Sequence, residues 1–138
     1  MQLTRSEARN KAMTILYQIF LEDKNKINYN IDDVIYDNLE IDNDFVKILV
    51  NGVISNKEKI DNLANKYLGT WPIDRLGFND QAIFRIAIYE LLFTDTPSVV
   101  VINEAIELAK KYSDDNVSKM LNATLDNIYH KEVINDKK

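Results

Sequence analysis

Few residues of this chain have the types and spacing that catalysis requires. An enzyme needs a nucleophile, a base or a metal ion held in a cleft, and the 138 residues include one histidine, His130, and no cysteine. This histidine lies near the C-terminal tail, where we expect a solvated surface side chain. Adjacent carboxylates occur at Asp32-Asp33 and Asp114-Asp115, and the starts of helices explain both pairs more simply. The three glycines are isolated, so no glycine-rich phosphate loop exists. We therefore expect no catalytic site, no metal site and no cofactor.

Three cations, Arg5, Arg9 and Lys11, stand close together near the N-terminus. The chain as a whole has a formal charge of −5, so it repels nucleic acid at long range. Any binding to RNA must therefore use a local basic patch or a basic partner. The three cations are the candidate patch, and a solvated helix face is the simpler interpretation.

These cations belong to a predicted first helix that runs from Thr4 to Glu22. Thr4 and Glu7 have the spacing of a capping box, in which a hydroxyl and a carboxylate each bond a backbone N–H that the helix leaves unpaired. Apolar residues recur at helical spacing along the helix, and we expect the three cations to lie outside this stripe. The stripe consists of Ala8, Ala12, Ile15, Leu16 and Ile19.

Further helices are expected in the first half of the chain. A short helix covers about residues 31–39, and Asp42 or Asn43 can cap the next one. Ser55 and Glu58 form a second possible capping box. The pattern therefore leaves open whether one long helix or two helices follow.

The stretch from Asp80 to Phe93 is the predicted centre of the fold. Its apolar residues leave no continuous polar face at 3.6 residues per turn, so a helix here must be covered on nearly all sides. The stretch is too short to span a bilayer. We expect its charged residues, Arg85 and Glu90, at the edge of the core, and Asn79 or Asp80 as the helix cap.

Two more helices should follow the central one. Ser98 is the expected cap of the first, and the second should begin within Asp114–Asn116. No segment of the chain alternates convincingly between apolar and polar residues with period two. The sequence therefore predicts an all-α protein.

The chain has the length of one domain. Gly69 is a plausible helix end, and Trp71-Pro72 favours an extended backbone. We therefore expect a single domain over 1–138, with an N-terminal helical lobe at about 1–68 and a C-terminal helical lobe at about 72–131. No signal peptide or membrane anchor is evident, so the predicted location is the cytoplasm.

Three motifs, in this order, resemble the NusB family of transcription antitermination factors. They are the basic opening helix RSEAR at 5–9; WPIDRL at 71–76 followed by DQAIFRIAIYEL at 80–91; and VINEAIELAK at 101–110 followed by KMLN at 119–122. Each motif alone could be any amphipathic helix. Their order and spacing cover most of the chain and carry the resemblance.

The resemblance implies an all-helical fold of about seven helices, arranged as two small perpendicular bundles that share a core. It also implies that the protein pairs with the ribosomal protein that doubles as NusE, and that the two together bind the boxA element of nascent RNA. The complex would then join RNA polymerase, with NusA and NusG, and oppose premature termination, notably of ribosomal RNA transcription. The expected protein is an adaptor and not an enzyme.

The resemblance also assigns RNA contacts to five residues. They are Arg5, Arg9, Lys11, Lys119 and Met120. Ser6 and Glu7 stand where more strongly basic members have arginine, which weakens the patch. The segment from Met120 to Ala123 replaces the usual Phe-Val-Asn-Gly, so an aromatic ring that could stack on a base is lost.

Partner contacts are implied at Tyr17 and Asp80. A carboxylate suits a basic ribosomal protein. Simpler interpretations stay open, because Asp80 could cap its helix and Tyr17 could serve packing alone. Asn103 and Glu104 belong to the third motif, and we interpret them as structural residues that hold their helix to its neighbours.

Two other functions are alternatives to RNA-dependent antitermination. A protein-only helical scaffold without RNA binding of its own would fit the negative charge and the diluted basic helix. The fold also resembles the RNA-binding domain that precedes some ribosomal-RNA cytosine methyltransferases. Such an enzyme needs a catalytic cysteine, and this chain has none.

Overall fold

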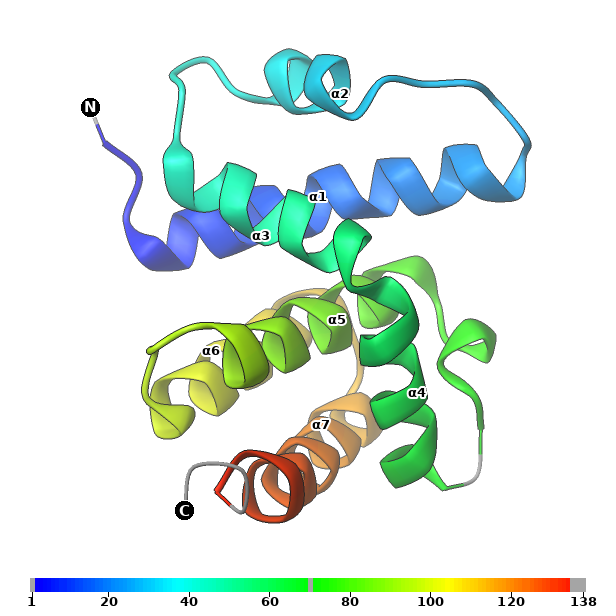
Figure 1. Ribbon diagram of the computed structural model, residues 1–138, viewed down its shortest axis with the longest axis vertical. Helices are drawn as coiled ribbons and strands as arrows, with labels where there is room; N and C mark the ends of the chain where they lie inside the picture. The colour runs from blue at the N-terminus through cyan, green and yellow to red at the C-terminus, as the bar shows by residue number, and fades with distance from the viewer. Residues whose placement is uncertain (1, 70, 135–138) are drawn as a thin grey trace.

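The computed structural model describes residues 2–69 and 71–134, which form seven α-helices and no strand (Figure 1). The helices are α1 (Arg5–Lys24), α2 (Ile31–Asn38), α3 (Asp44–Ser55), α4 (Lys57–Leu68), α5 (Phe78–Phe93), α6 (Ser98–Tyr112) and α7 (Asp115–Ile128). A 3₁₀ turn, η1 (Ile73–Arg75), precedes α5, and a π-helical turn, η2 (Tyr129–Val133), follows α7. The all-α prediction of about seven helices is confirmed.

Helix α5 lies at the centre of the fold, as predicted. It packs against α1, α3, α4, α6 and α7, and Phe84 and Ile88 in its middle have no exposed surface. Figure 1 shows α1, α2 and α3 together on one side of α5, with α4, α6 and α7 around its other side. Because α5 contacts both groups, their buried apolar residues join in a common core.

Arg85 and Glu90 lie inside this core and not at its edge. Each is only 1% exposed, so the prediction from their charge is wrong. Arg85 pairs with Asp61 of α4 at 2.8 Å, and Glu90 pairs with Arg9 of α1 at 2.8 Å. Partners on neighbouring helices offset the cost of burying these charges, which a single helix cannot show.

Two helix starts follow the predicted capping chemistry. Asn43, one of the two candidates, caps α3, because its side-chain oxygen accepts a hydrogen bond of 3.0 Å from the backbone N–H of Val46. The side chain of Asp114 likewise accepts one of 3.0 Å from the backbone N–H of Val117 at the start of α7. Gly69 ends α4 with a φ of +80°, a conformation that favours glycine.

Other predicted caps are wrong. The chain forms two helices, α3 and α4, where one or two were possible, but Ser55 still belongs to α3. Asn56 precedes α4 and makes no side-chain cap, so the proposed box of Ser55 and Glu58 does not form. Pro97, not Ser98, is the capping residue before α6. Proline pre-sets φ at a helix start, and no side chain that the structure describes caps the first backbone N–H groups of α6.

Thr70, between the two predicted lobes, and the tail 135–138 lie outside the described residues. None of the helices that the structure describes is long and apolar enough to cross a membrane.

Candidate functional site

A capping box places Arg5 at the first position of α1. The backbone N–H of Glu7 donates to Thr4 Oγ1 at 3.1 Å, and the backbone N–H of Thr4 donates to Glu7 Oε1 at 2.9 Å. The predicted box is thus confirmed. The hydrogen bond from the Thr4 backbone lowers the pKa of the Glu7 carboxyl, which keeps this residue charged at the helix start.

Arg5 lies against an aromatic ring at the start of α3. Its guanidinium carbon is 4.0 Å from the ring centroid of Phe45, a cation–π contact. Arg5 is exposed, and it forms no ion pair with any residue that the structure describes. The ring therefore supports one side of the guanidinium while its N–H groups stay available to a phosphate. Sequence reasoning missed Phe45, because its contact with α1 leaves no local pattern.

Arg9 is buried, contrary to the prediction that it lies outside the apolar stripe. Only 3% of the residue is exposed. Its Nε and Nη2 atoms donate to the two carboxylate oxygens of Glu90, each at 2.8 Å, and its Nη1 lies 3.8 Å from Glu104. Burial disfavours the charged guanidinium, but the Glu90 carboxylate outweighs burial and raises the pKa of Arg9. Arg9 thus fastens α1 to α5.

Polar contacts also join the beginning of α1 to α6. Ser6 Oγ donates to Glu104 Oε1 at 2.7 Å, and the amide of Asn10 and the hydroxyl of Tyr112 are 3.0 Å apart. Ser6 is thus engaged in an internal contact. The interpretation of Glu104 as a structural residue is consistent with these contacts.

Lys11, Lys119 and Met120 complete the predicted RNA residues. Lys11 of α1 and Lys119 of α7 are exposed and have no ion pair within 2–69 and 71–134. Met120 is half-buried and packs against the core. The structure thus places free cations on both α1 and α7, but no hydrogen bond or ion pair between described residues joins the two helices.

Tyr17 and Asp80 lie near the start of α5. The ring of Tyr17 meets that of Phe78 edge to face, with 5.9 Å between centroids, and 39% of Tyr17 is exposed. Asp80 does not cap α5, because the helix begins at Phe78 after Gly77, with no side-chain cap. Instead, the half-buried Asp80 carboxylate accepts a hydrogen bond from the hydroxyl of Ser113 at the end of α6.

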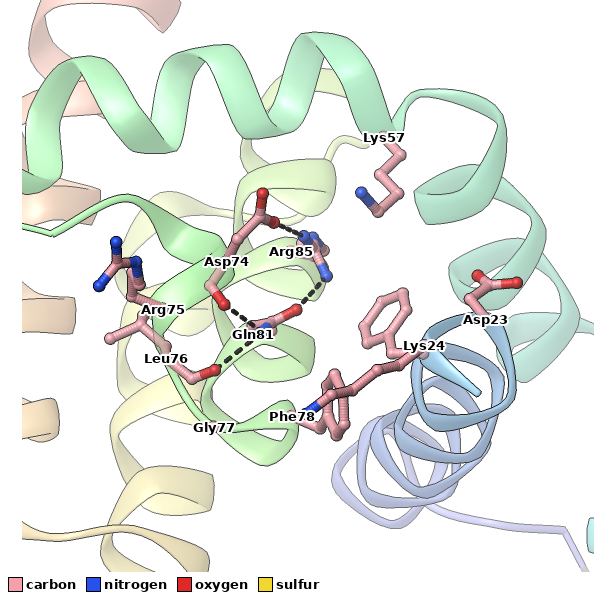
Figure 2. Close-up of a pocket in the computed structure, with 11 residues that line it drawn as sticks. Asp23, Lys24, Lys57, Asp74, Arg75, Leu76, Gly77, Phe78, Gln81 and Arg85 are labelled. Atoms are coloured by element: carbon pink, nitrogen blue, oxygen red, sulfur yellow. Dashed lines mark hydrogen bonds and ion pairs between the residues drawn. The ribbon is translucent and has the colours of Figure 1, made fainter. Parts of the chain in front are cut away.

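A cavity of about 690 Å³ adjoins Phe78. Figure 2 shows Lys24 reaching across the Phe78 ring, and its ammonium is 5.7 Å from the ring centroid. In the wall of the cavity, Arg85 Nη1 donates to Gln81 at 2.8 Å, and Gln81 donates to the backbone oxygen of Leu76 at 2.8 Å. These bonds hold the end of η1 to the start of α5. The Phe78 ring, which Tyr17 meets edge to face, lines the same cavity.

The described part of the chain has few other side chains that could serve catalysis or metal binding. It holds no group of three or more histidine, cysteine, aspartate or glutamate side chains that could bind a metal ion. His130 is exposed, as predicted, and its Nε2 lies 3.3 Å from Asp126 one helical turn earlier.

Comparisons with known proteins match this chain to one family over nearly its whole length. The model of the NusB family matches residues 6–130. Transcription antitermination protein NusB of Staphylococcus aureus (strain JH9) is 40% identical over 127 residues, which are 91% of this chain and 98% of that protein. The structure of T. maritima NusB superposes with a TM-score of 0.85 at 30% identity, covering 99% of this chain and 98% of that one.

A second similar structure contains other molecules besides the matching chain. It is a crystal structure of antitermination factors NusB and NusE in complex with dsRNA, with a TM-score of 0.78 at 28% identity. The match covers 91% of this chain and 96% of that one.

Proposed function

The chain belongs to the NusB family of transcription antitermination proteins, and from this premise we propose that it binds boxA-containing RNA together with the ribosomal protein NusE. The family match over residues 6–130 carries this proposal. Proteins of this family are transcription factors rather than enzymes, in agreement with the expected adaptor. The complex joins RNA polymerase, NusA and NusG in the cytoplasm and acts notably on ribosomal RNA transcription.

The RNA surface of this proposal uses the exposed cations on α1 and α7. Arg5, Lys11 and Lys119 are free to approach phosphates, because none has an ion-pair partner within the described residues. Met120 supplies an apolar contact to a base. Arg9 was also predicted to contact RNA, and that role stays untested. Its burial against Glu90 favours a positioning role, in which it holds α1 so that Arg5 and Lys11 are presented.

The NusE surface uses Tyr17 and Asp80. The partly exposed Tyr17 ring beside Phe78 offers an apolar anchor, and the nearby Asp80 suits a basic partner. Under this proposal the protein is one domain of two lobes, about 1–68 and 72–131, and α4, the last helix of the first lobe, packs against α5 and α7 of the second. Arg5, Lys11 and Tyr17 belong to the first lobe, while Asp80, Lys119 and Met120 belong to the second.

A protein-only scaffold is the alternative function. The observation that favours it is the burial of Arg9 against Glu90, which leaves Arg5 and Lys11 as the free cations of the predicted patch on α1. This alternative predicts binding to NusE that is indifferent to RNA and to the charge of Arg5.

Fluorescence anisotropy with labelled boxA RNA separates the two functions. We expect weak binding by the protein alone and stronger binding with NusE, because the basic partner adds phosphate contacts. A shuffled RNA of the same composition is the control and should bind less tightly to the pair. Absence of RNA binding at low salt, with and without NusE, would contradict the proposal.

A further inference from the structure

The segment from Ile31 to Ile48 holds the protein's excess negative charge. It comprises α2, the following loop and the start of α3, and we call its surface the α2–α3 face. The segment has six carboxylates against one lysine, so its net charge equals the −5 of the whole chain. The six carboxylates, all exposed, are Asp32, Asp33, Asp37, Glu40, Asp42 and Asp44. The rest of the chain is therefore neutral overall, and this face has a strong local potential.

Large apolar side chains are exposed among these carboxylates. Tyr36 is 80% exposed, Ile41 51% and Ile48 49%. Single exposed apolar residues are ordinary on a protein surface. Three within one segment, rimmed by charge, have the composition of an interaction site.

Two grooves adjoin two of these apolar residues, Tyr36 and Ile48. The first, of about 300 Å³, has Ile35, Tyr36 and Leu39 in its wall. The second, of about 430 Å³, runs between the start of α1 and the start of α3, with Ile48 in its wall and with Arg5, a proposed RNA contact, at its α1 side. Asp42 lines both grooves, so the two grooves adjoin at this carboxylate, and Asp32, Glu40 and Asp44 add further carboxylates to their walls.

Helix α2 is an outer element of the fold. Figure 1 shows it above α1, joined to the rest of the molecule by extended segments on both sides. It packs on α1 and buries only Val34 and Ile35. Tyr36, on another side of this helix, is left uncovered.

The negative charge of the α2–α3 face indicates which kind of molecule can bind there. Six carboxylates repel RNA, and a second copy of this chain would bring the same net charge of −5. We propose that the α2–α3 face is a docking surface for a basic segment of another protein, in which lysines or arginines flank an apolar anchor that enters the groove beside Tyr36. This surface shares no residue with the proposed NusE contacts at Tyr17 and Asp80.

The state of Lys47 is consistent with such a potential. Its ammonium lies 2.5 Å from Asp42. The hydrogen bond to Asp42, with the added charges of Asp44 and Asp32, raises the pKa of Lys47. The single lysine of the face is thus already paired, while Asp32 and Glu40 at the rim of the first groove have no ion-pair partner among the described residues.

A synthetic peptide can test this docking surface on the full chain. The probe is a fluorescein-labelled peptide of lysines and leucines, and the control peptide has serine in place of each leucine. We expect the leucine peptide to bind more tightly, and Tyr36→Ser to weaken its binding about tenfold, as for a central aromatic anchor. Asp32→Asn with Glu40→Gln should weaken binding and reduce its dependence on salt.

Matched variants elsewhere on the surface make the test specific. Val99→Ser removes an apolar side chain that is 66% exposed on α6, and Asp95→Asn removes an exposed charge from the loop before that helix. Both should leave peptide affinity unchanged. Amide resonances in an NMR titration should shift at Tyr36, Ile41 and Ile48.

Several outcomes would overturn the proposal. Equal affinity for the serine peptide would show that charge alone attracts the probe. Equal losses from Val99→Ser, or shifts centred on Tyr17, would place binding elsewhere. Because Arg5 adjoins the second groove, competition by boxA RNA for the peptide would identify the face as an RNA site only if it persisted in Arg5→Ala. Self-association in sedimentation that Tyr36→Ser abolishes would identify a second copy as the occupant.

Discussion

The guanidinium of Arg9 and the carboxylate of Glu90 form two hydrogen bonds of 2.8 Å inside the protein, although the residues are 81 positions apart. Removing one partner leaves the other charge buried and unpaired, which typically costs about 3–5 kcal/mol. We therefore expect Arg9→Met to lower the free energy of unfolding by about that amount in urea denaturation. The double variant Arg9→Met with Glu90→Leu should be more stable than Arg9→Met alone.

The same double variant separates the two roles of Arg9. It restores an uncharged, packed interior while removing the guanidinium. If Arg9 acts by positioning α1, the double variant should retain most of the RNA affinity measured with NusE. A large loss of RNA affinity in a variant of recovered stability would instead assign Arg9 a direct RNA contact.

Arg5 should contribute to RNA binding through its charge. Arg5→Ala removes one phosphate contact, so we expect the slope of log affinity against log salt to fall by about one. Anisotropy titrations at several salt concentrations, with NusE present, measure this slope. The matched control is Lys26→Asn, because Lys26 has a φ of +56°, which asparagine tolerates. An equal change in slope for Lys26→Asn would mean that net charge, and not a contact at Arg5, determines the affinity.

Local patterns explain how much of this structure the sequence could predict. The apolar spacing of α5 predicted its central position, and the spacing of Thr4 and Glu7 predicted the cap of α1. Each of these two signals is local, because the residues that form it are close together in the chain. Helix type and order therefore followed from the sequence.

Long-range pairing explains what the sequence could not predict. Arg9 has the position of a surface cation on α1, and only the approach of Glu90 from α5 makes its burial possible. Asp80 stands where a cap is expected, but α5 begins two residues earlier, and the hydroxyl that bonds Asp80 comes from Ser113, 33 residues away. No local spacing carries this information.

Asp80 and Ser113 provide a matched pair for the NusE surface. Either Asp80→Ala or Ser113→Ala removes the same hydrogen bond, which is worth about 0.5–1.5 kcal/mol. We expect similar losses of stability in thermal unfolding, with a further small loss for Asp80→Ala from its place in the first turn of α5. NusE affinity, measured by calorimetry, should fall for Asp80→Ala alone. Equal affinities for the two variants would give Asp80 a purely structural role.

Glu132 should make the free energy of unfolding depend on pH in the acid range. Lys66 Nζ and the Tyr67 hydroxyl donate to its Oε1 at 2.9 and 2.8 Å, and the bond from Lys66 is the main cause that lowers the pKa of Glu132 below 4.5. A carboxyl with a depressed pKa stabilises the fold above its ordinary pKa, and this contribution is lost as pH falls through the folded-state value. Urea midpoints at pH 7 and pH 3 should therefore differ less in Glu132→Gln than in the unmodified protein.

Glu58→Gln is the control for this pH dependence. Glu58 is exposed and has no hydrogen bond or ion pair with another described side chain. Its substitution should leave the difference between the two midpoints unchanged. If Glu132→Gln also left the difference unchanged, the contact between η2 and α4 would not contribute to acid sensitivity.

Gly52 of α3 makes room for the ring of Tyr89 on α5. A Cβ atom at position 52 would lie 2.2 Å from Tyr89 Cζ, so the ring would have to move. Alanine stabilises the interior of a helix by about 1 kcal/mol relative to glycine. Overpacking of a core, however, destabilises the fold by about 1–3 kcal/mol. We expect Gly52→Ala to destabilise the protein in urea denaturation. In a Tyr89→Ala background, where the ring is absent, the same substitution should become stabilising. Destabilisation of equal size in both backgrounds would mean that the close approach of α3 and α5 does not depend on this ring.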